Sequence, residues 1–206
     1  SKQAKTVVVV NPEICSAQLN YRDRESHFIF GDAATAVVME APREGIEGWE
    51  ILSTHLATTY SNNIRSDLGC LTPCEQKEMT QNSLENNDVK LFTQNGRKVF
   101  KEVVPLAYEH VIDHCEQLQI NSENIKRYWL HQANSHMNLF IAKKLLNRDP
   151  TFEDAPIILD KYANTAGAGS IIAFHLHRAD LKSGDMGIIC SFGAGYSVGS
   201  LVLKKL

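Results

Sequence analysis

Apolar residues recur along this chain at two alternating spacings, one typical of helices and one typical of strands. A spacing of three and four residues indicates helices over three ranges: 95–117, 135–147 and 166–181. Short apolar runs predict four strands around them, at 128–131, 157–159, 186–192 and 196–203. Strands separated by helices are typical of right-handed βαβ crossovers. The pattern therefore predicts an α/β fold with a mostly parallel mixed sheet between helices. Within the first helix, Pro105 is expected to cause a kink or a break.

The first part of the chain carries strand patterns only. The run Thr6–Val10 contains four consecutive valines, which predict a strand buried on both faces. Because such a strand is rarely the first element of a domain, we expect the chain to begin inside a larger fold. The runs 27–30 and 34–39 flank Gly31-Asp32 and predict a hairpin, and 48–56 predicts a half-buried strand.

These patterns divide the chain into two expected parts. Residues 1–45 are expected to end an N-terminal half, and residues 46–206 to form a C-terminal domain. Within the second part, residues 58–90 are polar and poor in apolar positions. Structureless loops of that length are usually functional or mobile, so we expect an excursion over a binding face.

Composition narrows the range of functions. The chain has 206 residues, of which 43% are hydrophobic, enough to build a substantial core. A formal net charge of -3 gives no basic surface for nucleic acid. No apolar run reaches the roughly 18 residues of a membrane helix, and the first residues do not lead into a signal peptide. We therefore expect a cytoplasmic protein with neither nucleic acid nor a membrane as its partner.

Cysteine usage indicates a reducing compartment. The five cysteines are odd in number and scattered: Cys15, Cys70, Cys74, Cys115 and Cys190. Such a set does not form a disulfide framework, and Cys70 and Cys74 lack the second pair that completes a zinc site. The i, i+4 spacing of His110 and His114 is compatible with a metal ion, but it is a weak indication by itself. We expect free thiols and no metal.

Two polar residues stand where predicted strands give way to helices, His131 after Tyr128-Trp129-Leu130 and Asn164 before the 166–181 helix. Ligands of α/β sheets bind at the carboxyl ends of the strands. Taken singly, His131 is equally well explained as a hydrogen-bonded buried histidine and Asn164 as a helix N-cap. The pairing favours catalysis, because small residues follow Asn164 and a Gly-Ala-Gly turn at 193–195 offers backbone N–H groups to an oxyanion.

Five short motifs occur in the order that a known family shares: Phe30–Val37, Asn95–Lys101, His131–Asn134, Ala163–Thr165 and Phe192–Ser200. Together they resemble the C-terminal half of β-ketoacyl-acyl-carrier-protein synthase III. That enzyme initiates type II fatty-acid synthesis and belongs to the thiolase-like superfamily. The resemblance runs from about Thr6 to Leu206. It implies a thiolase-like fold and an acyltransferase that catalyses decarboxylative Claisen condensation.

The resemblance also implies residue roles. In the family a cysteine at a helix N-terminus takes the acyl primer from acyl-CoA, because the helix dipole lowers the pKa of the thiol. His131 and Asn164 match the residues that hydrogen-bond the thioester carbonyl of malonyl-acyl-carrier protein and stabilise its enolate. Ala194 matches the oxyanion-hole turn. The family's carrier-protein contact maps to Gln132, Ala133, Asn134, Ser135 and His136.

The same resemblance implies a homodimer without a resident cofactor, since coenzyme A thioesters and phosphopantetheine enter as substrates. Three departures from the family are visible. No cysteine of this chain matches the nucleophile, so we expect it upstream of Ser1 and expect this chain to be inactive alone. Ala194 replaces the usual glycine and is expected to narrow the pocket. Ser135 and His136 stand where a basic residue is usual, so we expect weaker affinity for the carrier protein.

Two alternatives remain open. The parent protein is either a fatty-acid synthase enzyme or a specialised relative of secondary metabolism, for example one that uses a medium-chain primer. Alternatively, the chain belongs to a non-catalytic subunit that supports an active partner in a heterodimer. The presence of both His131 and Asn164 argues against this second alternative, because a scaffold does not need them.

Overall fold

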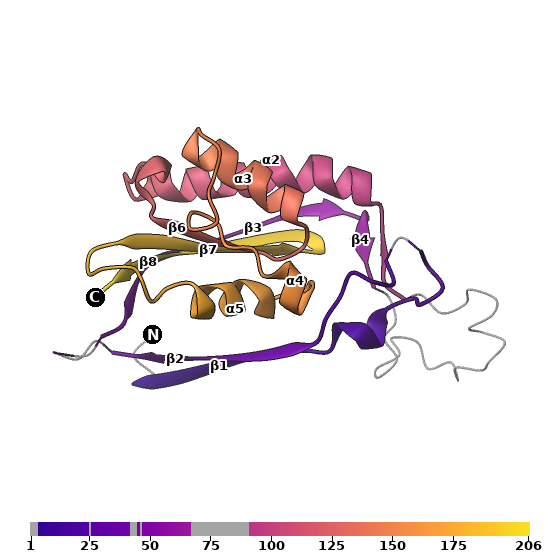
Figure 1. Cartoon of the computed structure of the whole chain (residues 1–206), viewed down its shortest axis with the longest axis horizontal. Helices are drawn as coiled ribbons and strands as arrows, with labels where there is room; N and C mark the ends of the chain where they lie inside the picture. The colour runs from indigo at the N-terminus through magenta and orange to yellow at the C-terminus, as the bar shows by residue number, and fades with distance from the viewer. Residues whose placement is uncertain (1–3, 25, 42–44, 46, 67–90) are drawn as a thin grey trace.

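The computed structural model describes residues 4–24, 26–41, 45, 47–66 and 91–206. The elements stack in layers (Figure 1), with α2 and α3 above a sheet, α4 and α5 below it, and a second sheet below α5. The strands are β1 (Thr6–Glu13), β2 (Ala33–Glu40), β3 (Trp49–Ser61), β4 (Ile64–Arg65), β5 (Thr93–Gln94), β6 (Arg127–Leu130), β7 (Met186–Gly193) and β8 (Gly195–Lys205). The helices are η1 (Cys15–Gln18), α2 (Gly96–Gln117), η2 (Ser122–Asn124), α3 (Ser135–Leu146), α4 (Leu159–Tyr162) and α5 (Ala168–Leu176).

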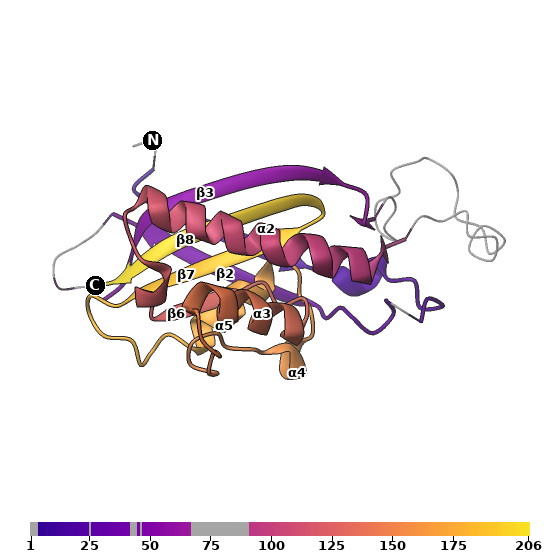
Figure 2. The ribbon, with the colours of Figure 1, turned by 90° about the horizontal axis from the view of Figure 1, so that it is seen from above.

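The larger sheet has the strand order β3-β8-β7-β6, which Figure 2 shows from above. Only the β6–β7 pair is parallel, whereas β7–β8 and β8–β3 are antiparallel. The predicted α/β class with a mixed sheet is confirmed, and so is the terminal hairpin. The expectation that most pairs in this sheet are parallel is wrong for the described residues.

The expected strand at 157–159 is replaced by a segment without regular secondary structure that leads into α4. The side chain of Gln132 explains this outcome. Its Nε2 donates to the carbonyl of Pro156 (3.2 Å), and its Oε1 accepts from the N–H of Ile158 (3.0 Å). Because a side chain satisfies these backbone groups, they are not paired in a strand ladder.

The smaller sheet pairs β1 with β2 in antiparallel register, with Val8 opposite Val38. Val7–Val10 are 40–60% exposed, so the expected burial on both faces is wrong in the described chain, where β2 and α5 are their neighbours. The predicted hairpin of 27–30 with 34–39 is also wrong. Only Phe30 makes a β-bridge, and its partner is Asn164.

The helices over the larger sheet follow the sequence pattern closely. Asn95 caps α2, because its Oδ1 accepts from the N–H of Lys98 (3.2 Å). Pro105 lies inside α2 without interrupting it, so the expected break is absent. Asn134 caps α3 in the same way. The third predicted helix is shorter than expected, since α5 ends at Leu176. No helix in the described ranges is long and apolar enough to cross a membrane.

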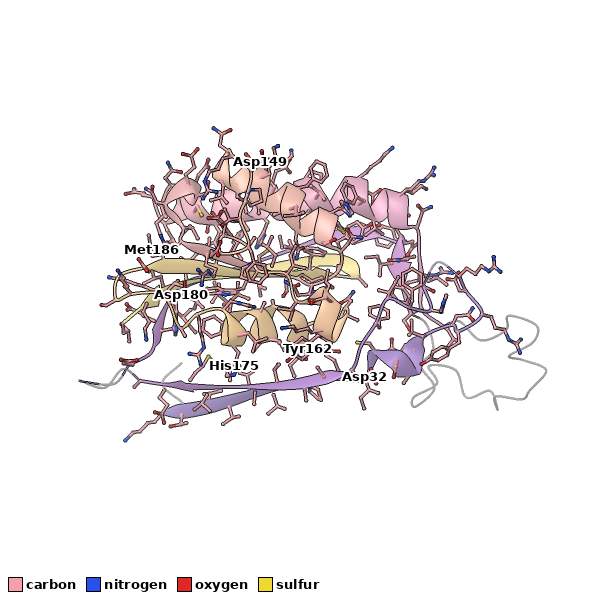
Figure 3. All side chains as sticks on the ribbon, viewed as in Figure 1. Asp32, Asp149, Tyr162, His175, Asp180 and Met186 are labelled. Carbon is pink, nitrogen blue, oxygen red and sulfur yellow. The ribbon has the colours of Figure 1, made fainter. Side chains whose placement is uncertain are left out.

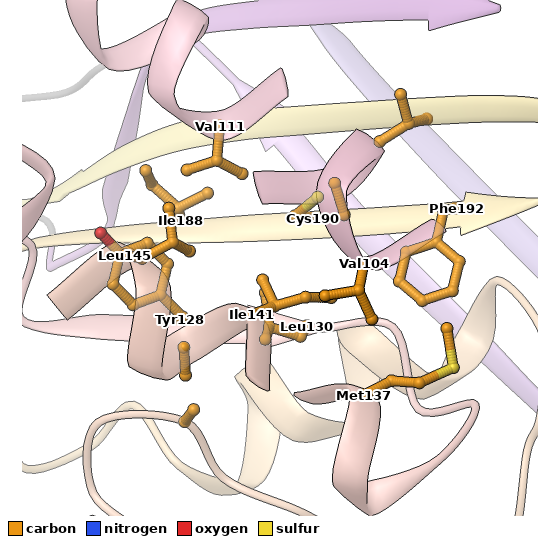
Figure 4. Close-up of a cluster of buried hydrophobic side chains, with 14 of the residues drawn as sticks. Val104, Val111, Tyr128, Leu130, Met137, Ile141, Leu145, Ile188, Cys190 and Phe192 are labelled. Carbon is orange, nitrogen blue, oxygen red and sulfur yellow. The ribbon is translucent and has the colours of Figure 1, made fainter. Parts of the chain in front are cut away.

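Two apolar clusters hold the layers together. One fills the space between α2, α3 and the larger sheet, and Figure 4 shows part of it around Val111, Ile141 and Ile188. The other lies between this sheet and α5 and centres on the fully buried Trp129. Strand β6 is therefore buried on both faces, which fixes the residue that follows it. The boundary after residue 45 stays a prediction.

Candidate functional site

His131 directly follows β6, and contacts with β7 fix both its backbone and its ring. Its N–H donates to the carbonyl of Cys190 on β7 (2.8 Å), which extends the β6–β7 ladder by one residue. Its ring meets the ring of Phe192 edge to face, with 4.7 Å between centroids. His131 is 7% exposed, and its buried Nδ1 has no partner among the described residues. Burial lowers the pKa of His131 to about 4, so the imidazole is neutral at neutral pH.

Asn164 lies in the loop between α4 and α5 and is 7% exposed. Its backbone bridges to the loop before β2: its N–H donates to Ile29 O (3.1 Å), and its carbonyl accepts from the Gly31 N–H (3.0 Å). In Figure 3 the labelled Asp32 and Tyr162, one from each of these two segments, lie next to each other. Oδ1 of Asn164 accepts from the Ala166 N–H (3.0 Å). Nothing in the described chain accepts from its Nδ2, which leaves that amide for a ligand.

The Gly193-Ala194-Gly195 turn joins β7 to β8, and Ala194 is exposed at its tip. His131, Asn164 and Ala194 all line one cavity of about 830 Å³. Much of the remaining wall is apolar, including Phe30, Phe92, Val99, Phe100 and Met137. The structure thus brings together the three residues that the sequence predicted for the site.

Cys15 and Glu13 line the same cavity, and neither was predicted from the sequence to belong to the site. Oε1 of Glu13 accepts from the Gly167 N–H (3.2 Å), so the end of β1 is tied to the start of α5. The pKa of the Cys15 thiol is raised to about 11 by burial and by the negative charges of Glu13 and Asp32. Cys15 is therefore a protonated thiol at neutral pH, unlike an activated nucleophile. No pattern in the sequence marked Cys15, which lies in the polar stretch that follows the predicted Thr6–Val10 strand.

The other cysteines are no better suited to catalysis. Cys115 and Cys190 are buried free thiols, and burial raises their pKa values to about 11 and about 12. Cys70 and Cys74 lie outside the described residues, as does most of the expected excursion at 58–90. The start of that excursion instead extends β3 and forms β4.

The five residues expected to contact a carrier protein differ in exposure. Gln132 is fully buried, and its amide bonds the backbone at Leu130, Pro156 and Ile158. Its buried side chain cannot contact a carrier protein, so we correct the expected role of Gln132 to a structural one. Asn134 and His136 are exposed and Ala133 and Ser135 half-buried, and a carrier contact through these four stays a prediction.

His110 and His114, whose spacing is compatible with a metal ion, share a hydroxyl instead. Ser200 Oγ lies 2.7 Å from His114 Nδ1 and 3.0 Å from His110 Nε2, and the ring of His55 stacks on that of His110. Over the ranges that the structure describes, no group of three or more His, Cys, Asp or Glu side chains is arranged to hold a metal ion.

The three residues that line the cavity thus carry three kinds of neutral hydrogen-bond donor: an imidazole N–H at His131, an amide at Asn164 and a backbone N–H at Ala194. Neutral donors suit an anion that forms during a reaction, because they stabilise it without a permanent counter-charge. Carbonyl chemistry through an enolate or a tetrahedral oxyanion matches this set.

Comparison with known proteins gives two family matches. Residues 1–59 match the family model described as 3-oxoacyl-[acyl-carrier-protein] synthase III, and residues 115–205 match the model described as the C terminal of the same synthase. A β-ketodecanoyl-[acyl-carrier-protein] synthase from Pseudomonas aeruginosa is 49% identical over 205 residues, which are 98% of this chain and 57% of that protein. A β-ketoacyl-[acyl-carrier-protein] synthase III from Aliarcobacter butzleri is 28% identical over 99% of this chain and 60% of that protein.

Solved structures show the same likeness. The crystal structure of 3-oxoacyl-[acyl-carrier-protein] synthase III from Aquifex aeolicus superposes with a TM-score of 0.79 at 26% identity. The match covers 98% of this chain and 58% of that one. The predicted thiolase-like fold is confirmed. The chain spans less than two thirds of the length of these relatives.

Proposed function

Because the chain belongs to the 3-oxoacyl-[acyl-carrier-protein] synthase III family, we propose that its cavity is the decarboxylation part of a condensing site. The observation that supports this most strongly is the convergence of His131, Asn164 and Ala194 on one cavity. The reaction is decarboxylative Claisen condensation of an acyl primer with malonyl-acyl-carrier protein, as in fatty-acid synthesis. The products are β-ketoacyl-carrier protein and carbon dioxide.

In the proposed first step, the thioester carbonyl of the malonyl group accepts hydrogen bonds from the His131 imidazole N–H and the Asn164 Nδ2. The bond to the carboxylate breaks, carbon dioxide leaves, and its electron pair forms an enolate whose oxygen these two donors stabilise. The low pKa of His131, about 4 because of burial, keeps the ring neutral while it donates.

In the proposed second step, the enolate carbon attacks the carbonyl of an acyl-cysteine thioester. The backbone N–H of Ala194 stabilises the tetrahedral oxyanion, and collapse of this intermediate releases the cysteine thiolate. The raised pKa values of Cys15, Cys115 and Cys190 do not suit these thiols to that role. We propose that the nucleophile lies in sequence that the relatives have and this chain does not cover.

Substitution of the two donors tests the first step in a protein that contains both this chain and the nucleophile. His131→Ala and Asn164→Ala are each expected to lower malonyl-thioester decarboxylation by at least about 100-fold, the usual effect of losing a preorganised donor. Self-acylation from acyl-CoA is expected to persist. Released carbon dioxide and intact-protein mass measure the two steps. His175→Ala is the matched control, since His175 is exposed on α5 away from the cavity lining.

The opposite pattern, loss of acylation with unharmed decarboxylation, would reverse the assigned roles. If His131→Ala and Asn164→Ala change neither step, the non-catalytic partner subunit becomes the better interpretation.

A separate experiment tests the assignment of the nucleophile. The 206-residue chain incubated with acyl-CoA is expected to gain no thioester adduct on its cysteines, because the thiols at Cys15, Cys115 and Cys190 are held protonated. Peptide mass spectrometry after the incubation measures this. An acyl group on Cys15, which lines the cavity, would overturn the assignment.

One comparison favours a specific primer. The 49%-identical relative from Pseudomonas aeruginosa is named a β-ketodecanoyl synthase. Carried to this chain, a ten-carbon β-keto product requires an eight-carbon primer, because the condensation adds two carbons. The apolar wall around Phe30, Phe92 and Phe100 supports a medium-chain group. A series of acyl-CoA primers is expected to give the highest kcat/KM at eight carbons. A maximum at acetyl-CoA would contradict this expectation.

The proposed partners follow from the same reaction. Acyl-CoA and malonyl-acyl-carrier protein are substrates, and no further cofactor is proposed. We propose contact with the carrier protein at Ala133, Asn134, Ser135 and His136, which lie at the start of α3. We also propose a homodimer in the cytoplasm, where the free thiols of the described chain remain reduced.

A further inference from the structure

Glu102 on α2 joins three segments that are far apart in the sequence. Its Oε2 accepts from the Tyr196 hydroxyl (2.8 Å), from Asn63 Nδ2 (2.8 Å) and from the Ser61 hydroxyl (3.5 Å). Ser61 ends β3, Asn63 precedes β4, and Tyr196 directly follows the Gly193–Gly195 turn. One carboxylate oxygen therefore connects a helix, a strand end and the turn at the cavity.

Tyr196 is the part of this network that reaches the turn. It is 2% exposed and belongs to the apolar cluster beneath α2, so packing fixes its ring. Its hydroxyl meets the exposed Glu102, where the bond to a charged acceptor is stronger than one between neutral groups. The hydrogen bonds from Tyr196 and then Asn63 hold the pKa of Glu102 below its usual range, which keeps the carboxylate charged at neutral pH.

The turn has one anchor at each end. On the β7 side, Phe192 is 6% exposed and packs against the His131 ring. On the β8 side, Tyr196 is bonded to Glu102. Between them, Ala194 is exposed and Gly195 has a φ of 134°, a conformation that L-residues rarely adopt. The direction of the Ala194 N–H therefore depends on these two anchors rather than on packing of the turn itself.

We propose that Glu102 is a positioning residue that acts through Tyr196 to aim the Ala194 N–H into the cavity. This rests on the proposed function, in which that N–H stabilises the tetrahedral oxyanion at the acyl-cysteine carbonyl. The same acyl carbonyl carries an oxyanion when the cysteine is acylated from acyl-CoA, so self-acylation uses the same N–H. Decarboxylation uses His131 and Asn164 instead. Loss of the Glu102–Tyr196 hydrogen bond is therefore expected to slow acyl transfer and to leave decarboxylation unchanged.

The experiment compares Tyr196→Phe, Glu102→Gln and Glu102→Ala in the protein that contains this chain and the nucleophile. Tyr196→Phe keeps the buried ring and removes only the hydroxyl. It is expected to lower kcat for self-acylation from acyl-CoA roughly ten-fold, less than the loss of a donor outright, with KM for acyl-CoA unchanged. Glu102→Gln retains an acceptor oxygen, so its rate of self-acylation is expected to fall less than that of Glu102→Ala. Malonyl-thioester decarboxylation is expected to stay at the wild-type rate in all three.

Matched controls come from the same region. Tyr60→Phe removes a hydroxyl that bonds Asn62 (2.6 Å) and does not bond Glu102. Glu109→Gln changes another exposed carboxylate of α2. Both are expected to behave as wild type. The self-acylation rate of the double variant Tyr196→Phe/Glu102→Ala is expected to fall no further than that of Glu102→Ala alone, because the two residues act through one hydrogen bond.

Three outcomes would overturn the proposal. Unchanged acylation in Tyr196→Phe would show that the bond does not position the N–H. An equal fall in acylation and decarboxylation, together with a lowered melting temperature, would show a purely structural role. Additive losses in the double variant would show independent action. Failure of the proposed function is distinguishable, because the wild-type protein would then show no His131-dependent decarboxylation.

Discussion

Asn164 is held between two alanines whose backbones are in unfavourable conformations. Ala163 has φ 55° and ψ -157°, a region that glycine occupies almost exclusively, and Ala166 has φ 46°. Such conformations cost about 1–3 kcal/mol each and persist only where the surrounding structure imposes them. Here the hydrogen bonds of Asn164 to Ile29 and Gly31 impose them. The strained residues thus lie on either side of Asn164, which lines the cavity.

Ala163→Gly is expected to raise the free energy of unfolding by about 1 kcal/mol, because glycine adopts this conformation without steric cost. Decarboxylation is expected to be retained, since the loop keeps its hydrogen bonds. Urea unfolding measures the change. Ala34→Gly on β2 is the control, because the same substitution in a regular strand is expected to lower stability. A loss of stability in Ala163→Gly would show that its backbone is not strained.

At the residue scale, the sequence predicted that His131 and Asn164 lie at one site, but it did not predict which groups support them. His131 and Asn164 were predictable because each stands in a recognisable motif where a predicted strand gives way to a helix. The buried role of Gln132 was not, since its partners Pro156 and Ile158 lie 24 and 26 residues further along the chain. Cys15 reaches the cavity only through the pairing of β1 with β2, which the sequence pattern did not predict.

The loop before β2 positions the loop that carries Asn164. Gly31 donates its N–H to the Asn164 carbonyl (3.0 Å), and a Cβ at Gly31 would overlap the carbonyl oxygen of Tyr162. The two loops therefore approach as closely as glycine permits. Gly31 belongs to the Phe-Gly-Asp motif, so this motif has a packing reason that its sequence alone does not reveal.

Gly31→Ala is expected to push the Asn164 loop away and to lower decarboxylation by up to about 100-fold, the effect of a displacement of about 1 Å in a catalytic group. Self-acylation is expected to persist, because the proposed mechanism gives Asn164 no role in it. Gly48→Ala is the control, since a Cβ there meets only a Leu206 methyl group at 3.8 Å and Gly48 does not line the cavity. Wild-type decarboxylation in Gly31→Ala would show that the loops separate without moving the Asn164 amide.

Elements that local patterns determine were predicted well. The helices α2 and α3 have the predicted period, and the β7–β8 hairpin has the expected turn. Elements whose pairing depends on residues far apart in the sequence were not predicted correctly. β2 pairs with β1 instead of with residues 27–30, and 157–159 forms no strand because Gln132 occupies its backbone groups. Local periodicity carries no information on such pairings.

A buried histidine cluster links α2 to β3 and β8. His110 is 4% exposed and faces His55 of β3, Ser200 of β8, and His114 and Asp113 of its own helix. Burial, then His55 and His114, lower the pKa of His110 to about 4, whereas Asp113 opposes the shift. Between pH 6.5 and 4 the unfolded chain therefore binds a proton that the folded chain does not. Stability is fully present above this range and falls as the pH falls through it.

His110→Leu is expected to flatten this pH dependence by up to about 1.4 kcal/mol per pH unit, the contribution of one proton. Urea unfolding at several pH values between 7.5 and 4.5 measures the slope. His175→Leu is the control, because His175 is exposed on α5. An unchanged slope in His110→Leu would show that His110 is protonated in the folded protein as readily as in the unfolded chain.

At the scale of the whole molecule, α5 is enclosed between two sheets of different character (Figure 1). The larger sheet is covered on both faces by helices and carries both apolar clusters. The β1–β2 sheet meets α5 on one face, and a large share of its valine surface is exposed in the described chain. Val8, Val10 and Val38 are 58%, 60% and 62% exposed, and Val8 lies directly opposite Val38. Such a contiguous apolar strand surface favours association.

Solutions of the 206-residue chain are accordingly expected to self-associate as the concentration rises, and Val8→Lys with Val38→Glu is expected to suppress this. The two substituted residues face each other across the strands, so their opposite charges are compatible with the β1–β2 register. Sedimentation velocity over a concentration series measures the change, and circular dichroism checks that the fold is retained. Phe152→Ser is the control, because Phe152 is also exposed (52%) but lies outside this sheet. If the charged pair and Phe152→Ser reduce association equally, or if neither does, the valine surface is not its cause.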